Sequence, residues 1–210
     1  QPELFAIPLA FSGDTTAVRS LLSLAKSDSP PTEVLYALGY SGQLAAVKPL
    51  VMAMGEESLA VAAAEACQLI LGANLYDDQF IKEQFSEEEL FEEELAAFKE
   101  GKMPPHPSGQ AYGENVHTLV NDPDRWRQWL REHRQRFDTE QCYRLGEPFS
   151  ATAVCRSLYR PGVCYQLRRY IHDEMVIRFK LNLPFTTNEP VHKQWERIQQ
   201  IAQWVQQNME

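Results

Sequence analysis

Residues 38–50 read LGYSGQLAAVKPL, and they repeat the pattern of residues 9–21, LAFSGDTTAVRSL. Every matched pair is offset by 29 residues, including the two Ser-Gly pairs and the two Ala-Val pairs. A fixed offset in this range is typical of stacked helical hairpins, in which each unit buries its apolar face against its neighbours. Such arrays bind partners over an extended surface. The repeat therefore predicts an architecture and a mode of binding, and it names no reaction.

Residues 1–75 are expected to form this array, a short α-solenoid of helical hairpins. The hairpins turn at Gly13 and Gly42, and Asp14 is expected to cap the helix after the first turn. A third, alanine-rich helix is predicted for residues 57–71, with Gly72 ending it. Small residues along these segments are expected to let consecutive helices approach closely.

The composition shifts after residue 75, and an acidic segment with a Pro/Gly-containing linker is predicted for residues 76–121. Apolar residues from Leu90 to Phe98 recur at helical spacing, which indicates an acidic amphipathic helix. The acidic run 87–94 lacks the glycine-turned ligand spacing of a calcium loop. We expect a solvated face there, or one that pairs with the arginine-rich residues 125–178.

Residues 122–210 are predicted to form a C-terminal helical subdomain, which makes the whole chain all-α. Asp122 followed by Pro123 is a strong helix start, and the helix that follows mixes tryptophans with arginines. Further helices are predicted after Ser150, over residues 163–175, and from about Pro190 onward. Residues 177–183 alternate between apolar and polar side chains, so both a helix end and a short strand fit them.

Composition narrows the class of protein. The chain has 210 residues, of which 44% are hydrophobic and 23% charged, as in ordinary folded domains. A net charge of −9 argues against nonspecific binding to nucleic acid or anionic membranes. The four cysteines follow no metal-ligand spacing and are too sparse for a disulfide scaffold. A reduced, cytoplasmic setting without metal or cofactor is therefore expected.

The chain begins with Gln1, and residues 3–11 already read as an interior helix of an array. Arrays of this kind need a terminal repeat that covers the first apolar face. We therefore expect the chain to be the C-terminal part of a longer protein, and a processed mature N-terminus is the alternative.

The chain resembles an uncharacterised bacterial family of HEAT-like repeat proteins, often encoded beside type VI secretion components. The matching stretches are LGYSG at 38–42 with AVKPL at 46–50, AEA at 64–66 with ILG at 70–72, the tryptophan-containing residues 126–137, YRLG at 143–146 and QLRR at 166–169. The resemblance implies a HEAT-like array within a protein about twice this length. It supplies no catalytic residue, and it implies a role near a secretion apparatus through gene position alone.

The main hypothesis is a noncatalytic protein–protein interaction scaffold, and the resemblance implies a role accessory to type VI secretion. Aromatic and arginine side chains dominate the energetics of protein interfaces. The candidate binding residues, where they lie exposed, are Tyr36, Tyr40, Tyr76, Trp126 and Tyr159. The sequence leaves the oligomeric state open.

Two other classes of function stay open as alternatives. A hydrolase would need carboxylates such as Glu65, Asp77 or Asp78 gathered in a concave pocket near the end of the array. A nucleic-acid-binding module would use the tryptophans and arginines of residues 126–136, as stacking platforms and phosphate contacts. Cys155 or Cys164 paired with a distant histidine could form a nucleophile, but no recognisable motif surrounds either cysteine, which favours buried structural thiols.

Overall fold

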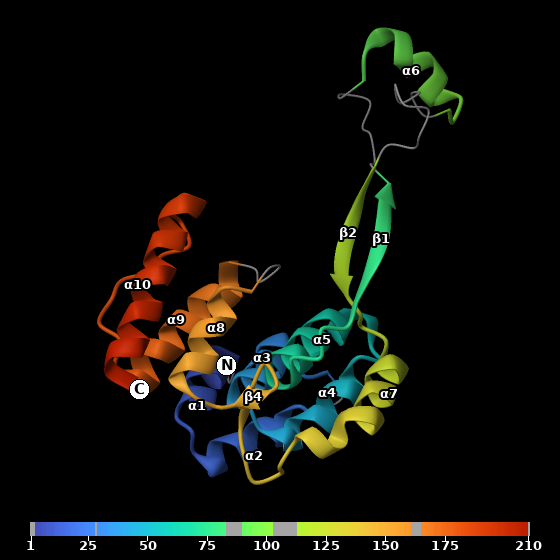
Figure 1. Cartoon of the computed structure of the whole chain (residues 1–210). Helices are drawn as coiled ribbons and strands as arrows, with labels where there is room; N and C mark the ends of the chain where they lie inside the picture. The colour runs from blue at the N-terminus through green and yellow to red at the C-terminus, as the bar shows by residue number, and fades with distance from the viewer. Residues whose placement is uncertain (1–2, 28, 83–89, 103–112, 161–164, 210) are drawn as a thin grey trace. The chain divides into compact units, whose positions relative to one another are not determined.

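The computed structural model describes two compact units, one built from Gln1–Asn74 with Asn121–Glu210 and the other from Leu75–Val120 (Figure 1). The first unit therefore combines both ends of the chain. The segments described are residues 3–27, 29–82, 90–102, 113–160 and 165–209.

The N-terminal part of the first unit is helical throughout, as the repeat predicts. Its elements are α1 (Glu3–Phe11), α2 (Thr15–Leu24), α3 (Thr32–Ser41), the 3-10 turn η1 (Leu44–Ala46), α4 (Val47–Ala53) and α5 (Glu57–Leu71). The Asp14 side chain accepts a hydrogen bond from the backbone N–H of Thr16 and so caps α2. Gly42 and Gly72 both adopt the left-handed conformation that ends α3 and α5.

Helix α3 packs against α1 on one side and α5 on another. A Cβ atom added at Gly39 would lie 2.8 Å from the Cα atom of Ala66, so α3 and α5 approach closely only because a glycine faces an alanine. Small residues thus allow a close approach here, between two helices that η1 and α4 separate in the chain. The core of this region is made mainly of aliphatic and alanine side chains from α1 to α5, together with the rings of Phe11 and Tyr40.

The C-terminal part of the first unit contains more helices and one short hairpin. Its elements are α7 (Pro123–His133), η3 (Arg134–Arg136), β3 (Tyr143–Arg144), β4 (Glu147–Pro148), α8 (Ala151–Leu158), α9 (Tyr165–Phe179) and α10 (Val191–Met209). Asp122 and Ser150 cap α7 and α8 through their side chains, as predicted. For residues 177–183 the sequence allows a helix end or a short strand. Helix α9 runs to Phe179, so residues 177–179 are a helix end, and residues 180–183 form no strand.

The β3–β4 hairpin joins the two parts of the first unit. The backbone N–H of Tyr143 donates to the carbonyl of Gly42 (2.7 Å), and the N–H of Leu145 donates to that of Leu69 (2.7 Å). The N–H of Gly146 bonds the carbonyl of Ile70 (2.9 Å). Carbonyl groups at helix C-terminal ends have no partner within the helix. The hairpin supplies those partners for α5, and it fixes the turn after α3.

A buried ion pair lies beside the hairpin. The Nη2 atom of Arg144 donates to both carboxylate oxygens of Glu174 (2.9 and 2.7 Å) and to the carbonyl of Tyr40 (3.1 Å). Both side chains are 0% exposed, and Arg178 of α9 approaches the same carboxylate (3.3 Å) while donating to the carbonyl of Ala10. Burial raises the pKa of Glu174, and the two guanidinium groups oppose that rise.

The second unit contains a long antiparallel hairpin and a short helix. Strands β1 (Tyr76–Lys82) and β2 (Gly113–Leu119) pair from Tyr76 opposite Leu119 to Lys82 opposite Gly113. Helix α6 (Glu92–Lys99) lies between them in the chain and agrees with the predicted acidic helix. Residues 83–89 and 103–112, which hold part of the predicted acidic run and linker, fall outside the described residues.

The two strand pairs correct the prediction of an all-α chain. The chain is mostly helical, but β1 with β2 and β3 with β4 form two small sheets. Strands β1 and β2 read YDDQFIK and GENVHTL, without the strict apolar alternation that marks a half-buried strand. The HEAT-like solenoid itself stays a prediction. Among the described residues, no helix is long and apolar enough to cross a membrane.

Candidate functional site

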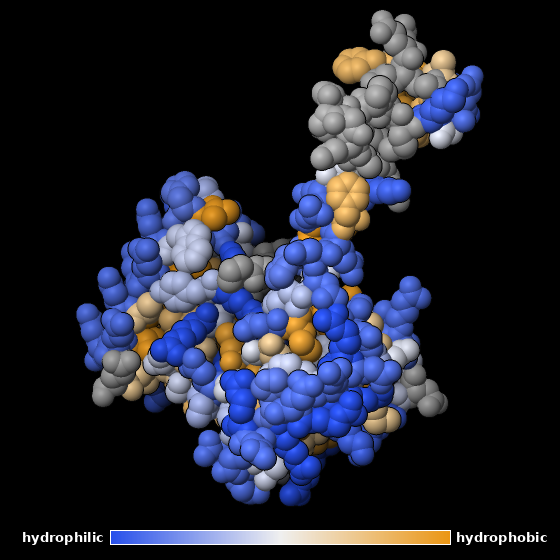
Figure 2. All heavy atoms as spheres, turned by 45° about the vertical axis from the view of Figure 1, so that its right-hand side comes forward, coloured by the Kyte–Doolittle hydropathy of each residue, from blue (hydrophilic) through white to orange (hydrophobic). Residues whose placement is uncertain are grey.

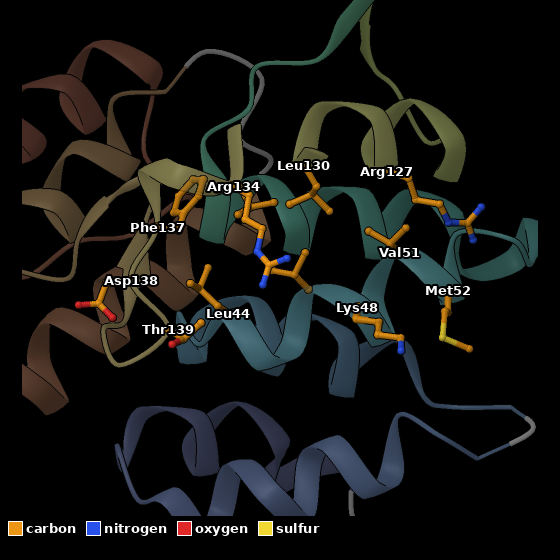
Figure 3. A pocket seen from close by; sticks show the side chains of 12 residues that line it. Leu44, Lys48, Val51, Met52, Arg127, Leu130, Arg134, Phe137, Asp138 and Thr139 are labelled. Atoms are coloured by element: carbon orange, nitrogen blue, oxygen red, sulfur yellow. The ribbon is translucent and has the colours of Figure 1, made fainter. Parts of the chain in front are cut away.

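An open groove of about 1080 Å³ lies in the first unit between α4 and α7 (Figure 3). The η1 turn, the end of α5, η3 and the loop after η3 complete its walls. Its lining residues are Leu44, Val47, Lys48, Val51, Met52, Leu71, Arg127, Leu130, Arg134, Phe137, Asp138 and Thr139.

Each wall of the groove is a stripe of side chains at helical spacing. On the η1–α4 side the stripe runs through residues 44, 47, 48, 51 and 52. On the other side it runs through residues 127, 130, 134 and 137. Residues three and four apart lie on the same face of a helix, which explains why one wall comes from each helix.

The floor of the groove is apolar, and part of its rim on α4 is exposed. Val47, Val51 and Leu71 are buried, whereas Met52 is 65% exposed. On the face of the larger unit seen in Figure 2, hydrophilic side chains cover most of the surface and hydrophobic ones emerge as small patches. Methionine adapts well to varied binding partners, so an exposed Met52 beside an apolar floor suits a binding groove.

Basic side chains surround this apolar floor. Lys48 comes from α4, Arg127 from α7 and Arg134 from η3, whose guanidinium reaches toward α4 in Figure 3. Arg127 is bonded to Asp124 (2.6 Å). Lys48 and Arg134 have no ion-pair partner in the part of the chain that the structure describes. The groove thus concentrates positive charge in a chain of net charge −9.

A second groove of about 570 Å³ runs along the other side of α4, toward α2. Lys48 and Met52 line both grooves, so α4 is the ridge between them. Lys26 and Glu56 add one charge of each sign to the second groove. The larger groove is the more cationic of the two.

A further apolar surface lies between α1 and α9. A cavity of about 460 Å³ is lined there by Ile7, Phe11, Tyr170 and their neighbours, with the carboxylates of Glu33 and Asp173 at its edge. Phe5 and Ile177 are exposed nearby, at 64% and 54%. Its charges are acidic, in contrast to those of the α4–α7 groove.

Two of the five candidate binding residues lie in the core, so they do not meet the condition that a binding residue be exposed. Tyr40 and Trp126 are both 0% exposed. The Tyr40 ring packs edge-on against Phe11 and Tyr170, and its hydroxyl donates to the carbonyl of Leu167 (3.2 Å). An aromatic ring on the inner face of a helix gains more from burial than it would gain at the surface.

The other three predicted binding residues are half-buried, and each makes a contact within its own unit. The Tyr36 hydroxyl donates to Glu65 (2.6 Å), and the Tyr159 hydroxyl donates to the carbonyl of Ile198 (3.2 Å). Tyr76 belongs to the second unit and stacks on His117, with ring centroids 4.7 Å apart. None of these three lines the groove between α4 and α7.

The carboxylates proposed for a hydrolase do not line either groove beside α4. Glu65 accepts from Tyr36 in the first unit, while Asp77 and Asp78 lie on β1 in the second. Asp78 bonds an exposed His117 (2.9 Å). The described residues contain no group of three or more histidine, cysteine or acidic side chains that could hold a metal ion.

The tryptophans of α7 face inward, which removes the stacking platform of the nucleic-acid alternative. Trp126 is fully buried, and Trp129 is 8% exposed and stacks on His133 with centroids 4.4 Å apart. Stacking on single-stranded bases needs exposed rings. The arginines of this segment remain at the surface, and two of them line the groove instead.

Cys67 and Cys155 are buried, which fits the interpretation of buried cysteines as structural thiols. Burial raises the pKa of the Cys67 thiol, and it raises that of Cys155 to about 11 against the opposing charge of Arg156. A thiol with a raised pKa is a poor nucleophile at neutral pH. Cys164 lies outside the described residues.

Sequence reasoning missed the groove, although part of its signal was present. Lys48 belongs to the repeated segment, and Arg127, Leu130 and Arg134 follow a helical spacing that the tryptophans obscured. Nothing in the sequence indicates that these two segments face each other. Comparison of the chain with protein-family models, curated proteins and solved structures finds no match.

Proposed function

We propose that this chain is a noncatalytic protein–protein interaction scaffold whose docking surface is the groove between α4 and α7. The observation that carries the proposal is an open apolar floor rimmed by Lys48 and Arg134, which have no ion-pair partner among the described residues. Apolar centres with charged rims are typical of protein interfaces.

The shape of the groove favours a protein segment as its ligand. Two helix faces form its walls, and a third element lying between them would contact both stripes along their length. Exposed apolar area such as that of Met52 would leave water on binding, which is the main favourable contribution to association. Arginine and methionine are both enriched at protein interfaces.

The partner class rests on the resemblance stated above. A component of a type VI secretion apparatus is the partner that this resemblance suggests, and the structure supports the binding mode without selecting the partner. The HEAT-like array is part of the same proposal, with α1 to α5 as its hairpins.

Met52→Glu tests the docking surface, and Val61→Glu is its matched control. Both side chains are exposed hydrophobic residues on helices, at 65% and 60%, but only Met52 lines the groove. A buried carboxylate facing a partner costs binding free energy, so we expect Met52→Glu to lose captured partners in a pull-down from the native host. Val61→Glu should keep them.

Equal capture by both variants would contradict the docking surface. A second outcome is that the captured proteins depend on Met52 and yet include no secretion component at low or high salt. That result would contradict the secretion partner and leave the docking surface intact. Thermal unfolding of both variants checks that each is folded, since exposed substitutions change stability only slightly.

A further inference from the structure

The shape and charge of the α4–α7 groove together describe one kind of partner. Resting on the proposed function, we infer that the groove binds an amphipathic helix of a partner protein that carries acidic residues on either side of its apolar stripe. The inference adds a partner chemistry to a docking surface.

The length and walls of the groove specify a helix. The stripe on η1 and α4 extends from Leu44 to Met52, which is about 12 Å at 1.5 Å per residue. Two to three helical turns cover that length. A helix that lies in a groove of this kind anchors through side chains at i, i+3, i+4 and i+7. The apolar floor of Val47, Val51 and Leu71 is the surface that such anchors would cover.

The charges on the rim specify acidic flanks. Lys48 stands on one wall, and Arg127 and Arg134 stand on the other, so cations border the floor on both sides. A helix that carries glutamates beside its apolar stripe would place carboxylates near both walls. A basic helix would be repelled by the same side chains, which gives specificity as well as attraction.

One end of the groove has the opposite charge. Asp138 and Thr139 lie at the end near Leu44, whereas Arg127 and Met52 lie at the other end, as Figure 3 shows. A helix carries partial positive charge at its N-terminus and partial negative charge at its C-terminus. The bound helix is therefore expected to point its N-terminus toward Asp138 and its C-terminus toward Arg127.

The test measures binding of designed peptides to the whole chain by fluorescence anisotropy. The probe is a fluorescein-labelled peptide of about 14 residues, with leucines at i, i+3, i+4 and i+7 and glutamates beside them. One control has lysines in place of the glutamates, and another has the same composition in an order that breaks the apolar stripe. A fluorescein-labelled single-stranded oligonucleotide is included as a different class of anionic ligand.

We expect the acidic helical peptide alone to bind. Lys48→Glu with Arg134→Glu should weaken binding about tenfold or more, because two attractive contacts become repulsive. The matched double variant Arg19→Glu with Lys193→Glu changes charge equally at exposed positions outside the groove, and it should bind as the wild type does. Binding should weaken as salt rises, since exposed charges are screened.

The orientation of the bound helix has its own test, with a spin label attached at Thr139→Cys. This spin label should quench a fluorescent label at the peptide's N-terminus more strongly than one at its C-terminus.

Other outcomes would overturn the inference in distinct ways. Equal binding of the lysine or scrambled peptide would reject the acidic helix and leave an apolar docking groove. Binding of the oligonucleotide alone, lost in Lys48→Glu with Arg134→Glu, would assign the groove to nucleic acid. A salt-sensitive dimer in sedimentation velocity, abolished by Met52→Glu, would make a second copy the occupant. If no peptide binds while Met52→Glu still loses captured host partners, the inference fails and the proposed docking surface stands.

Discussion

At the scale of single residues, Gly13 and Gly42 show how equivalent positions in a repeat acquire different roles. Both glycines have φ of +70°, a conformation that costs other residues about 1–2 kcal/mol. A Cβ atom at Gly13 would meet nothing within 4 Å, whereas one at Gly42 would lie 2.6 Å from the carbonyl oxygen of Tyr143. The sequence repeat predicts both turns, and it does not distinguish them.

The pair gives a stability prediction with an internal control. Gly13→Ala should lower the free energy of unfolding by about 1 kcal/mol, which is the backbone cost alone. Gly42→Ala should cost about 2 kcal/mol more, because the β3 backbone must move and its 2.7 Å hydrogen bond to Gly42 is disturbed. Urea unfolding of both variants measures the difference. Equal losses would show that the hairpin does not press on this turn.

Cys155 predicts how stability depends on alkaline pH. Burial raises the pKa of its thiol from 9.0 to about 11, so the native state keeps a proton that the unfolded chain releases above pH 9. Stability contributed by this thiol is therefore complete below pH 9 and is lost as pH rises toward 11. The difference in unfolding free energy between the wild type and Cys155→Ala should shrink by about 1 kcal/mol between about pH 8 and pH 10. A difference that does not change with pH would contradict the raised pKa.

At the scale of elements, local signals predicted the helices well and the strands poorly. Three helix starts were predictable from N-cap residues, namely Asp14, Asp122 and Ser150. Each of these side chains accepts a hydrogen bond from a backbone N–H two or three residues further along. The β1–β2 pair depends on residues far apart in the chain, as where Asp78 lies opposite His117. Neither strand of that pair has an apolar pattern strong enough to show its partner.

The β3–β4 hairpin offers a comparison of a buried and an exposed ion pair. Arg144 and Glu174 are 0% exposed, whereas Arg156 and Glu147, on α8 and β4, are 60% and 49% exposed. Arg144→Met and Glu174→Gln should each cost about 3 kcal/mol or more, because each breaks a fully buried ion pair and leaves the remaining charge with fewer partners. The double variant should lose less than the two single losses combined. Arg156→Met should cost about 1 kcal/mol or less.

Urea unfolding of the four variants measures these losses. Strict additivity of Arg144→Met and Glu174→Gln would contradict a direct interaction between them. No sequence pattern predicts this pair, because nothing relates YRLG at residues 143–146 to the glutamate of α9. Arginine is rarely fully buried, so composition alone places Arg144 at the surface.

At the scale of the whole molecule, the sequence predicts three consecutive segments, whereas the structure divides the chain into two compact units. The proposed boundaries at residues 75 and 121 nearly coincide with the limits of the second unit, Leu75–Val120. The segments on either side belong to one unit, because the hairpin bonds the backbone of Gly42, Leu69 and Ile70. Backbone bonds of this kind leave no trace in side-chain patterns. The groove was out of reach for the same reason, since its walls come from residues 44–52 and 127–139.

The buried contacts of Arg144, Glu174 and Arg178 also bear on how the chain folds during synthesis. The carbonyl groups of Ala10 and Tyr40 are synthesised long before the side chains that bond them. Arg178 donates to the carbonyl of Ala10, and Arg144 donates to that of Tyr40. The Tyr40 ring can pack on Phe11 early, but its contact with Tyr170 and the hydrogen bond of its hydroxyl to Leu167 form only later. The first hairpins are therefore synthesised before several of their hydrogen-bond and packing partners exist. Their native packing is completed only after residues 144–178 have been translated.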